Sequence, residues 1–186
     1  MGLIKKVSQL VLLSGIVVIT GCQNMPPADF TVQDVGMLSN RVDADLISLT
    51  VGFAPQNQQK KVEGNHVVPP LWKEALTDAL NRSLAFRDGS DARVNLSVRI
   101  VEFDLPAAGF DMKSQVEAIY EIVDRNNGDI LFTQSISSKG VVPMDYAFMG
   151  AVRAVESMNR AVRNNISDFI NSLETADLSK PMFLGE

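Results

Sequence analysis

The sequence predicts an α+β domain in which an antiparallel four-stranded sheet carries two helices on one face, in the chain order β-α-β-β-β-α. Four segments alternate apolar and polar residues, which is typical of strands with one buried side. Two other segments repeat apolar residues every three or four positions, as amphipathic helices do. Packing both helical stripes against the apolar face of the sheet would bury all of these residues in a single core.

The first strand and the first helix are predicted from residues 43–53 and from the segment that begins at Pro69 and Pro70. In the strand, one face would hold Ile47, Leu49, Val51 and Phe53. The polar segment 54–68 is predicted to be an exposed loop. Proline is well tolerated in the first turn of a helix. The apolar stripe of this helix consists of Trp72, Leu76, Ala79, Leu80 and Leu84.

Three further strands are predicted at 93–104, 114–124 and 130–138, followed by a long helix from about 145 to 173. The second and third of these strands would form a hairpin, because Asn127 and Gly128 accept the positive φ angles of a tight turn. Arg153 is expected on the solvent side of the long helix. The apolar stripe of that helix consists of Phe148, Val152, Val155, Met158, Val162, Ile166, Phe169 and Leu173.

The N-terminal residues have the features of a secretory signal peptide. Lys5 and Lys6 precede an apolar run over residues 7–19, and small residues follow at Thr20 and Gly21. The run is shorter than the roughly 20 apolar residues that a permanent membrane-spanning helix needs. Export of the chain is therefore predicted, rather than a transmembrane anchor.

The signal ends in Val18-Ile19-Thr20-Gly21-Cys22, which resembles the lipobox of bacterial lipoproteins. The resemblance implies cleavage before Cys22, a diacylglycerol on its sulfur and an acyl chain on the new amine. More than one chain is needed to hold a protein firmly on a bilayer. Cys22 is the only cysteine, so no disulfide can form within the chain. The alternative is an ordinary secreted protein with a chance cysteine at this position.

Gln23 follows the cysteine, and its identity bears on location. By resemblance to sorting in Gram-negative bacteria, Asp at this position retains a lipoprotein in the inner membrane, so Gln23 favours the outer membrane. The chain would then be lipid-anchored on the periplasmic face. We expect a signal peptide at 1–21, the lipidated cysteine and a tether at 22–41, the domain at 42–174 and a C-terminal tail at 175–186.

The charge of the mature chain argues against nucleic acid as a partner. Removing Lys5 and Lys6 leaves 15 of the 17 basic side chains against 22 acidic ones, a formal charge of −7. An acidic surface repels both nucleic acid and anionic lipid headgroups. We therefore expect two kinds of contact, the membrane through the lipid and a protein of the cell envelope; the oligomeric state is left open.

The sequence contains no recognisable catalytic or metal-binding motif. Its single histidine, His66, lies in a polar segment and is predicted to be a solvated loop residue. Zinc needs several Cys or His ligands, which this chain lacks. Glu102 with Asp104 and Glu117 with Glu121 are candidate carboxylate pairs for hydrolysis, but a solvated strand face has the same pattern. No cofactor is expected apart from the covalent lipid on Cys22.

The connection from Leu105 to Met112 is unusually apolar for an exposed loop. Leu105, Phe110 and Met112 are therefore the candidate surface for a partner, with Phe110 as an aromatic anchor. The alternative is that the loop folds back over the core. An exposed edge strand, which can add a partner's strand, is a second candidate surface.

Beyond the lipobox, the chain resembles several envelope lipoproteins in its element order. The resemblance rests on the Trp-x-x-Ala-Leu-x-x-Ala-Leu run within 72–84, the hairpin over 120–131 and the helix pattern that contains Arg153 and Asn165. It is similar to the ABC-type transport auxiliary lipoproteins, and more loosely to the curli-secretion lipoprotein and the N-terminal domain of TolB. The resemblance implies a non-catalytic accessory or assembly role. The alternatives are an envelope-polymer hydrolase and a small lipid- or ligand-binding lipoprotein.

Overall fold

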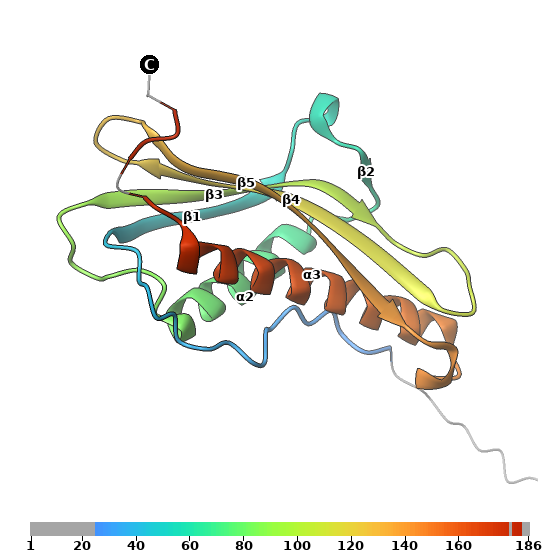
Figure 1. The fold of residues 1–186 in the computed structure, drawn as a ribbon. Coiled ribbons are helices and arrows are strands. Elements are labelled where there is room, and N and C mark those ends of the chain that lie inside the picture. The colour runs from blue at the N-terminus through green and yellow to red at the C-terminus, as the bar shows by residue number, and fades with distance from the viewer. Residues whose placement is uncertain (1–24, 179, 184–186) are drawn as a thin grey trace, which may run out of the picture.

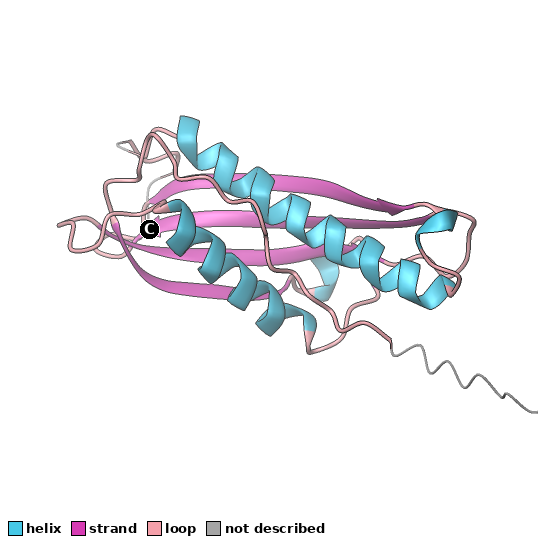
Figure 2. Ribbon diagram, turned by 90° about the horizontal axis from the view of Figure 1, so that it is seen from below, coloured by secondary structure: helices cyan, strands magenta, loops and turns pink. Residues whose placement is uncertain are grey.

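The computed structural model describes residues 25–178 and 180–183, and it has a sheet on one side and two helices on the other (Figures 1 and 2). The signal peptide, Cys22 and Gln23 lie outside the described residues. The long elements are β1 (Asp45–Phe53), α2 (Val68–Ser83), β3 (Arg93–Asp104), β4 (Met112–Asp124), β5 (Ile130–Val142) and α3 (Gly150–Thr175). Three short elements accompany them: η1 (Gln56–Gln58), β2 (Lys61–Val62) and η2 (Met144–Tyr146).

The sheet is mixed and five-stranded, so the predicted antiparallel four-stranded sheet is wrong in these two details. Its order is β1-β3-β4-β5, and β2 also pairs with β3 beyond the end of β1. Both β1 and β2 run parallel to β3. The reason is the connection, because α2 returns the chain along the face of the sheet before β3 begins, which is how parallel neighbours are joined. The strand β2 lies in the segment 54–68 that was predicted to be a loop.

The antiparallel half of the sheet follows the prediction more closely. β3 pairs with β4, and β4 pairs with β5, through a hairpin in which Gly128 has a φ of 80°. Both hairpin strands are longer than the alternation suggested, because the pairing extends to Met112 and Val142. This extension brings Met112 into the sheet, where its side chain is buried.

The buried side of β1 differs from the predicted one at a single residue. The register against β3 shifts between Leu46 and Ser48, so the alternation is interrupted at Ile47. As a result Leu46 packs against the core, whereas Ile47 is an exposed apolar residue. Leu49 is buried, and Val51 and Phe53 pack at the edge of the core as expected.

The helix α3 packs closely across β4 and β5. The rings of Tyr120 and Phe169 stack with centroids 4.1 Å apart, and the Tyr120 hydroxyl donates to Asn165 Oδ1 over 2.9 Å. Burial raises the pKa of the Tyr120 phenol, so it stays a neutral donor. The backbone of α3 also crosses Gly140 of β5 so closely that a Cβ there would lie 1.9 Å from the carbonyl oxygen of Ser157.

The N-terminal end of α3 lies later in the chain than predicted. Residues 144–146 form η2, and the α-helix begins only at Gly150. Phe148, which was expected in the apolar stripe, therefore lies in the connection and is 97% exposed. Arg153 is buried instead of solvated, and its guanidinium donates to the carbonyl oxygens of Met144 and Ala147 over 2.9 and 3.1 Å.

Most of the described part of the predicted tether, 22–41, packs against the domain. Phe30, Val32 and Leu38 are buried in the core, and the Phe30 ring meets Trp72 edge-on at 6.4 Å. These apolar side chains are spaced irregularly, which is why no strand or helix pattern revealed them. In Figure 2 this segment crosses the helices on the face away from the sheet.

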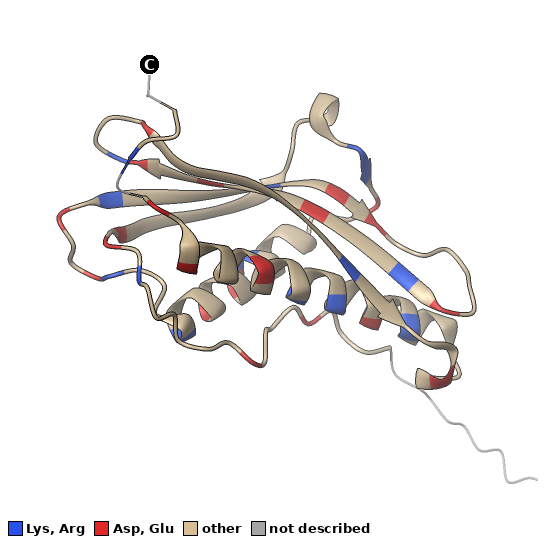
Figure 3. Cartoon of the chain, in the orientation of Figure 1, with Lys and Arg blue, Asp and Glu red and all other residues tan. Residues whose placement is uncertain are grey.

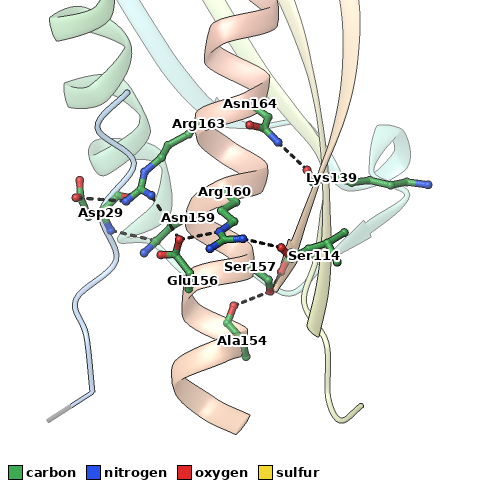
Figure 4. A network of polar contacts seen from close by, with 11 residues as sticks. Asp29, Ser114, Lys139, Ala154, Glu156, Ser157, Asn159, Arg160, Arg163 and Asn164 are labelled. Carbon is green, nitrogen blue, oxygen red and sulfur yellow. Dashed lines mark hydrogen bonds and ion pairs between the residues drawn. The ribbon is translucent and has the colours of Figure 1, made fainter. Parts of the chain in front are cut away.

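A polar contact fixes this N-terminal segment to α3 (Figure 4). The backbone N–H of Asp29 donates to Asn159 Oδ1 over 3.1 Å, and Arg163 donates to the Asp29 carbonyl oxygen over 2.8 Å. Hydrogen bonds from Thr31, with Arg163 nearby, lower the pKa of the Asp29 carboxyl. The chain is therefore held on the domain from Asp29 onward.

The segment predicted as a C-terminal tail, 175–186, also contacts the domain. Ala176 and Leu178 pack against the core just after α3 ends. Phe183 then forms an isolated antiparallel bridge with Ile130 at the start of β5. The bridge lies at the end of the sheet that holds the β4–β5 hairpin (Figure 1).

Candidate functional site

A surface groove between α2 and β1 is the candidate functional site. Its volume is about 500 Å³, within the usual range for a binding cleft. The helical wall is a single face of α2, since its residues are three or four positions apart. It is made by Lys73, Thr77, Leu80, Asn81 and Leu84. The opposite wall is made by Leu46, Ile47, Ser48 and Leu49 of β1, with Phe86 nearby.

The strand that forms this groove is the edge of the sheet. β1 pairs with β3 on one side, and within the described residues no strand pairs with its other side. An unpaired strand edge presents backbone N–H and C=O groups that can accept a further strand. Because α2 lies over this edge, an added strand would have helical side chains above it as well as a backbone partner beside it (Figure 2).

Leu84, which lines this groove, has an unusual backbone conformation. It has a φ of 52° and a ψ of 39°, and it is the only residue other than glycine with a positive φ in the described chain. The backbone N–H of Leu84 donates to Asn81, and that of Ala85 donates to Leu80, which is the hydrogen-bond pattern of a Schellman C-cap. Glycine is favoured at this position because a side chain costs about 1–2 kcal/mol there. The leucine side chain is instead 44% exposed and lines the groove.

The charges around the groove are mixed rather than of a single sign. Lys73 and Asp88 lie in its lining, and the Arg41 guanidinium donates to the carbonyl oxygens of Leu84 and Phe86 over 2.7 and 2.6 Å. Arg41 thus holds the connection that follows α2 through two of its carbonyl groups. A wall of apolar and polar side chains with only three charged residues, Arg41, Lys73 and Asp88, suits a polypeptide better than a highly charged ligand.

The three residues predicted as a partner surface differ widely in exposure. Phe110 is 80% exposed, Leu105 is half-buried against the core, and Met112 is only 6% exposed. The prediction that these three residues form one exposed surface is wrong for Met112, because β4 begins at Met112, two residues before the predicted start of the strand. Leu105 is also held in place, since its backbone N–H donates to Glu63 over 2.9 Å.

Two substitutions should distinguish the buried residue Met112 from the exposed residue Phe110 by their effects on stability. Met112→Ser should lower the free energy of unfolding by about 2 kcal/mol or more, because it leaves a cavity and a hydroxyl in the core. Phe110→Ser should change it by less than about 0.5 kcal/mol, since the ring is mostly in solvent. Urea denaturation of both variants measures this difference. Equal destabilisation by the two would contradict the placement of Phe110.

The candidate catalytic carboxylates lie on the face of the sheet opposite the helices, where each has a polar partner. Glu117 accepts hydrogen bonds from Lys60 over 2.6 Å and from Ser135 over 2.8 Å, and the bond from Lys60 is the main reason that its pKa is lowered. Glu121 pairs with Arg99. A general acid needs a raised pKa, so these contacts do not prepare Glu117 for that role.

The other acidic pair is also engaged in side-chain contacts. Gln115 donates to Glu102 over 3.1 Å, and Lys61 bonds to Asp104. Figure 3 shows Lys and Arg residues interspersed with Asp and Glu over both the strands and the helices. These contacts resemble the ordinary pairing of a solvated sheet face.

His66 and Trp72 both lie outside the groove. His66 is exposed in the segment before α2, and Trp72 is fully buried in the core. Over residues 25–178 and 180–183, no group of three or more His, Cys, Asp or Glu side chains could hold a metal ion. Over the same residues, no helix combines the length and the apolar character needed to cross a membrane.

The groove itself was not predicted from the sequence. Ile47 and Leu84 were both assigned to buried stripes, and both line the groove instead. One feature of the sequence pointed to an unusual helix end. The first helix has no glycine or asparagine at the position of Leu84 to adopt the left-handed conformation that commonly ends a helix.

Comparisons with known proteins give a fold but no family. No protein-family model matches the chain, and neither does any curated protein sequence. Among solved structures, a Xanthomonas campestris protein of the DUF330 family has a TM-score of 0.52 at 9% identity, over 78% of this chain and 90% of that one. This likeness shows a shared fold.

Two further solved structures overlap less well. A candidate lipoprotein from Caulobacter crescentus has a TM-score of 0.43 at 20% identity, over 63% of this chain and 87% of that one. The PelC dodecamer from Paraburkholderia phytofirmans has a TM-score of 0.41 at 12% identity, over 70% and 90% of the two chains. Both TM-scores are too low to support an argument about function.

Proposed function

We propose that this protein is a lipid-anchored outer-membrane lipoprotein that acts as a non-catalytic accessory or assembly component of a cell-envelope machine. The anchor is supported by the lipobox that ends at Cys22, and the outer membrane by Gln23. The accessory role is supported by the resemblance to envelope lipoproteins and by the groove between α2 and β1, which offers a place for a partner.

The observation that carries the proposal is the open edge of β1 beneath one face of α2. An extended polypeptide segment of the partner adds to β1 as a further strand and hydrogen bonds to its free backbone groups. Alternate side chains of that segment point toward α2 and pack against Leu80 and Leu84, while the others point away. Backbone pairing supplies affinity, and the helical wall supplies selectivity.

Leu84 provides a test that separates binding from stability. Leu84→Gly removes the side chain from the groove and also relieves the left-handed backbone, so the two effects on the folded state largely offset each other. We expect the free energy of unfolding to change by less than about 1 kcal/mol. Recovery of the partner should fall several-fold when the full-length lipoprotein is purified from crosslinked cells and bound proteins are quantified by mass spectrometry.

Val67→Gly is the matched control, because Val67 is 45% exposed and does not line the groove. It should leave the recovery of the partner unchanged. If Leu84→Gly retains the full recovery while folding normally, the groove is not the binding site. If Leu84→Gly unfolds the protein, Leu84 serves the core, and its placement in the groove wall has no binding role.

The alternative functions have less support from the site. A hydrolase would need a tuned acid or nucleophile, and the candidate carboxylates are instead paired with cations or amides. A carrier of small lipids would need a deep apolar cavity between the helices and the sheet. Stacked Tyr120 and Phe169 occupy that space beneath α3, and the fully buried Trp72 side chain fills the core beside them.

A further inference from the structure

One end of the domain exposes several large apolar side chains from two neighbouring loops. Phe148 is 97% exposed and Phe110 is 80% exposed, so neither ring contributes to the core. We call this set the apolar end; its exposed members are Phe110, Met144, Tyr146, Phe148 and Met149. Monomeric soluble proteins rarely expose so many large apolar residues together unless they contact something.

The two loops lie side by side because β4, which begins after the first loop, pairs with β5, which ends before the second loop. Met112, at the start of β4, pairs with Val142, at the end of β5, so the connections 105–111 and 143–149 leave the sheet at the same end. The Met112 side chain also lies against Gly150, where α3 begins. Buried Arg153 bonds to the carbonyl oxygens of Met144 and Ala147, which holds the second loop in a fixed shape.

The N-terminal segment leads toward this same end. Asp29 is fixed to α3 by Asn159 and Arg163, and from there the chain runs back to Met25 on the side of the molecule where α3 begins (Figures 1 and 2). Cys22 is three residues before Met25, which spans about 10 Å at most. A lipid on Cys22 therefore leaves the bilayer surface close to Met25, and with it close to the apolar end.

We propose that the apolar end inserts into the interface of the bilayer that holds the lipid on Cys22, as a second and non-covalent membrane contact. This inference rests on the proposed lipid anchor. The bilayer is the occupant because the short spacer brings it within reach, and because aromatic and methionine side chains suit the boundary between headgroups and acyl chains. Asp111 and Asp145 border the set, so the attraction is apolar and does not require anionic lipid.

This contact would fix the orientation of the domain on the membrane. With the apolar end in the interface, the opposite end of the sheet points away from the bilayer. Leu84, at the C-terminal end of α2, lies toward that opposite end (Figure 1). The binding groove therefore stays accessible to a partner in the periplasm.

Depth-dependent fluorescence quenching tests the inference. The full lipidated protein is reconstituted into phosphatidylcholine vesicles with brominated acyl chains, as the wild type and as the variants Phe148→Trp and Phe183→Trp. Phe183 is the matched control, since its ring is exposed at the opposite end, near Ile130. The wild type supplies the background from buried Trp72. Bromine should reduce the emission of the tryptophan at 148 by about half and leave that of the tryptophan at 183 unchanged.

The outcomes separate this inference from the anchor. If the wild type does not float with the vesicles, the lipid anchor fails, and the second contact is overturned with it. If the wild type floats but the tryptophan at 148 is quenched no more than the one at 183, only the second contact is overturned. A tryptophan at 148 that is shielded from both bromine and aqueous acrylamide would overturn it too, because a second copy of the chain would then cover this end.

Discussion

Gly140→Ala should destabilise the domain strongly, because a methyl group at this position would collide with the backbone of α3. A Cβ at this position would lie 1.9 Å from the Ser157 carbonyl oxygen and 2.5 Å from the Ala161 amide nitrogen. Both atoms belong to the backbone of α3, so a rotamer change cannot relieve the clash. The helix must move away from β5, which opens the packing around Tyr120 and Phe169. We expect a loss of at least about 3 kcal/mol in the free energy of unfolding, measured by urea denaturation.

Gly52→Ala is the control for this prediction. Gly52 is a strand residue like Gly140, but nothing lies within 4 Å of the Cβ that it would gain. The same methyl group should therefore be neutral or slightly stabilising there, because alanine restricts the unfolded chain. If the two variants unfold at the same urea concentration, α3 does not cross β5 at the described distance.

Cys22→Ala should have the largest functional effect. The thiol is the attachment point for the diacylglycerol in the lipobox resemblance, so its loss removes both lipidation and cleavage at this position. The variant should remain as a longer precursor, or it should leave the membrane fraction as a soluble protein. The apolar end cannot replace the anchor, because a peripheral contact is far weaker than two or more acyl chains. Cell fractionation with immunoblotting measures the change.

Gly21→Ala is the matched control, since the lipobox pattern accepts either glycine or alanine at the position before the cysteine. This variant should be cut and retained on the membrane like the wild type. Retention of mature-length Cys22→Ala protein on the membrane would contradict the lipid anchor. The same result would leave the groove between α2 and β1 as a site on a protein that is held by other means.

The helices and the antiparallel strands could be predicted because their signals are local. Alternation identified β3, β4 and β5, and the stripes identified α2 and most of α3. The direction of β1 was missed, although a strand, a helix and a further strand in succession commonly form a parallel pair. The shifted register near Ile47 could not be seen, because a bulge depends on the partner strand and leaves no period of its own.

The candidate site was less accessible to sequence reasoning than the fold. Met112 was assigned to a loop because its burial depends on pairing with Val142, thirty residues away in the chain. Phe30, Val32 and Leu38 are irregularly spaced in the sequence, so neither a helical nor a strand pattern predicted their packing over the helices. Their burial matters for function, because it fixes most of the described part of the predicted tether to the domain.

Both functional proposals depend on the chemistry of Cys22. The groove between α2 and β1 needs the anchor to place it in the envelope, and the apolar end needs it to be near a bilayer. The most direct test is the intact mass of the mature protein purified from the membrane fraction. We predict a chain that begins at Cys22 and carries the added mass of a diacylglycerol and an amine-linked acyl chain. A mature chain with an unmodified Cys22 thiol would contradict it.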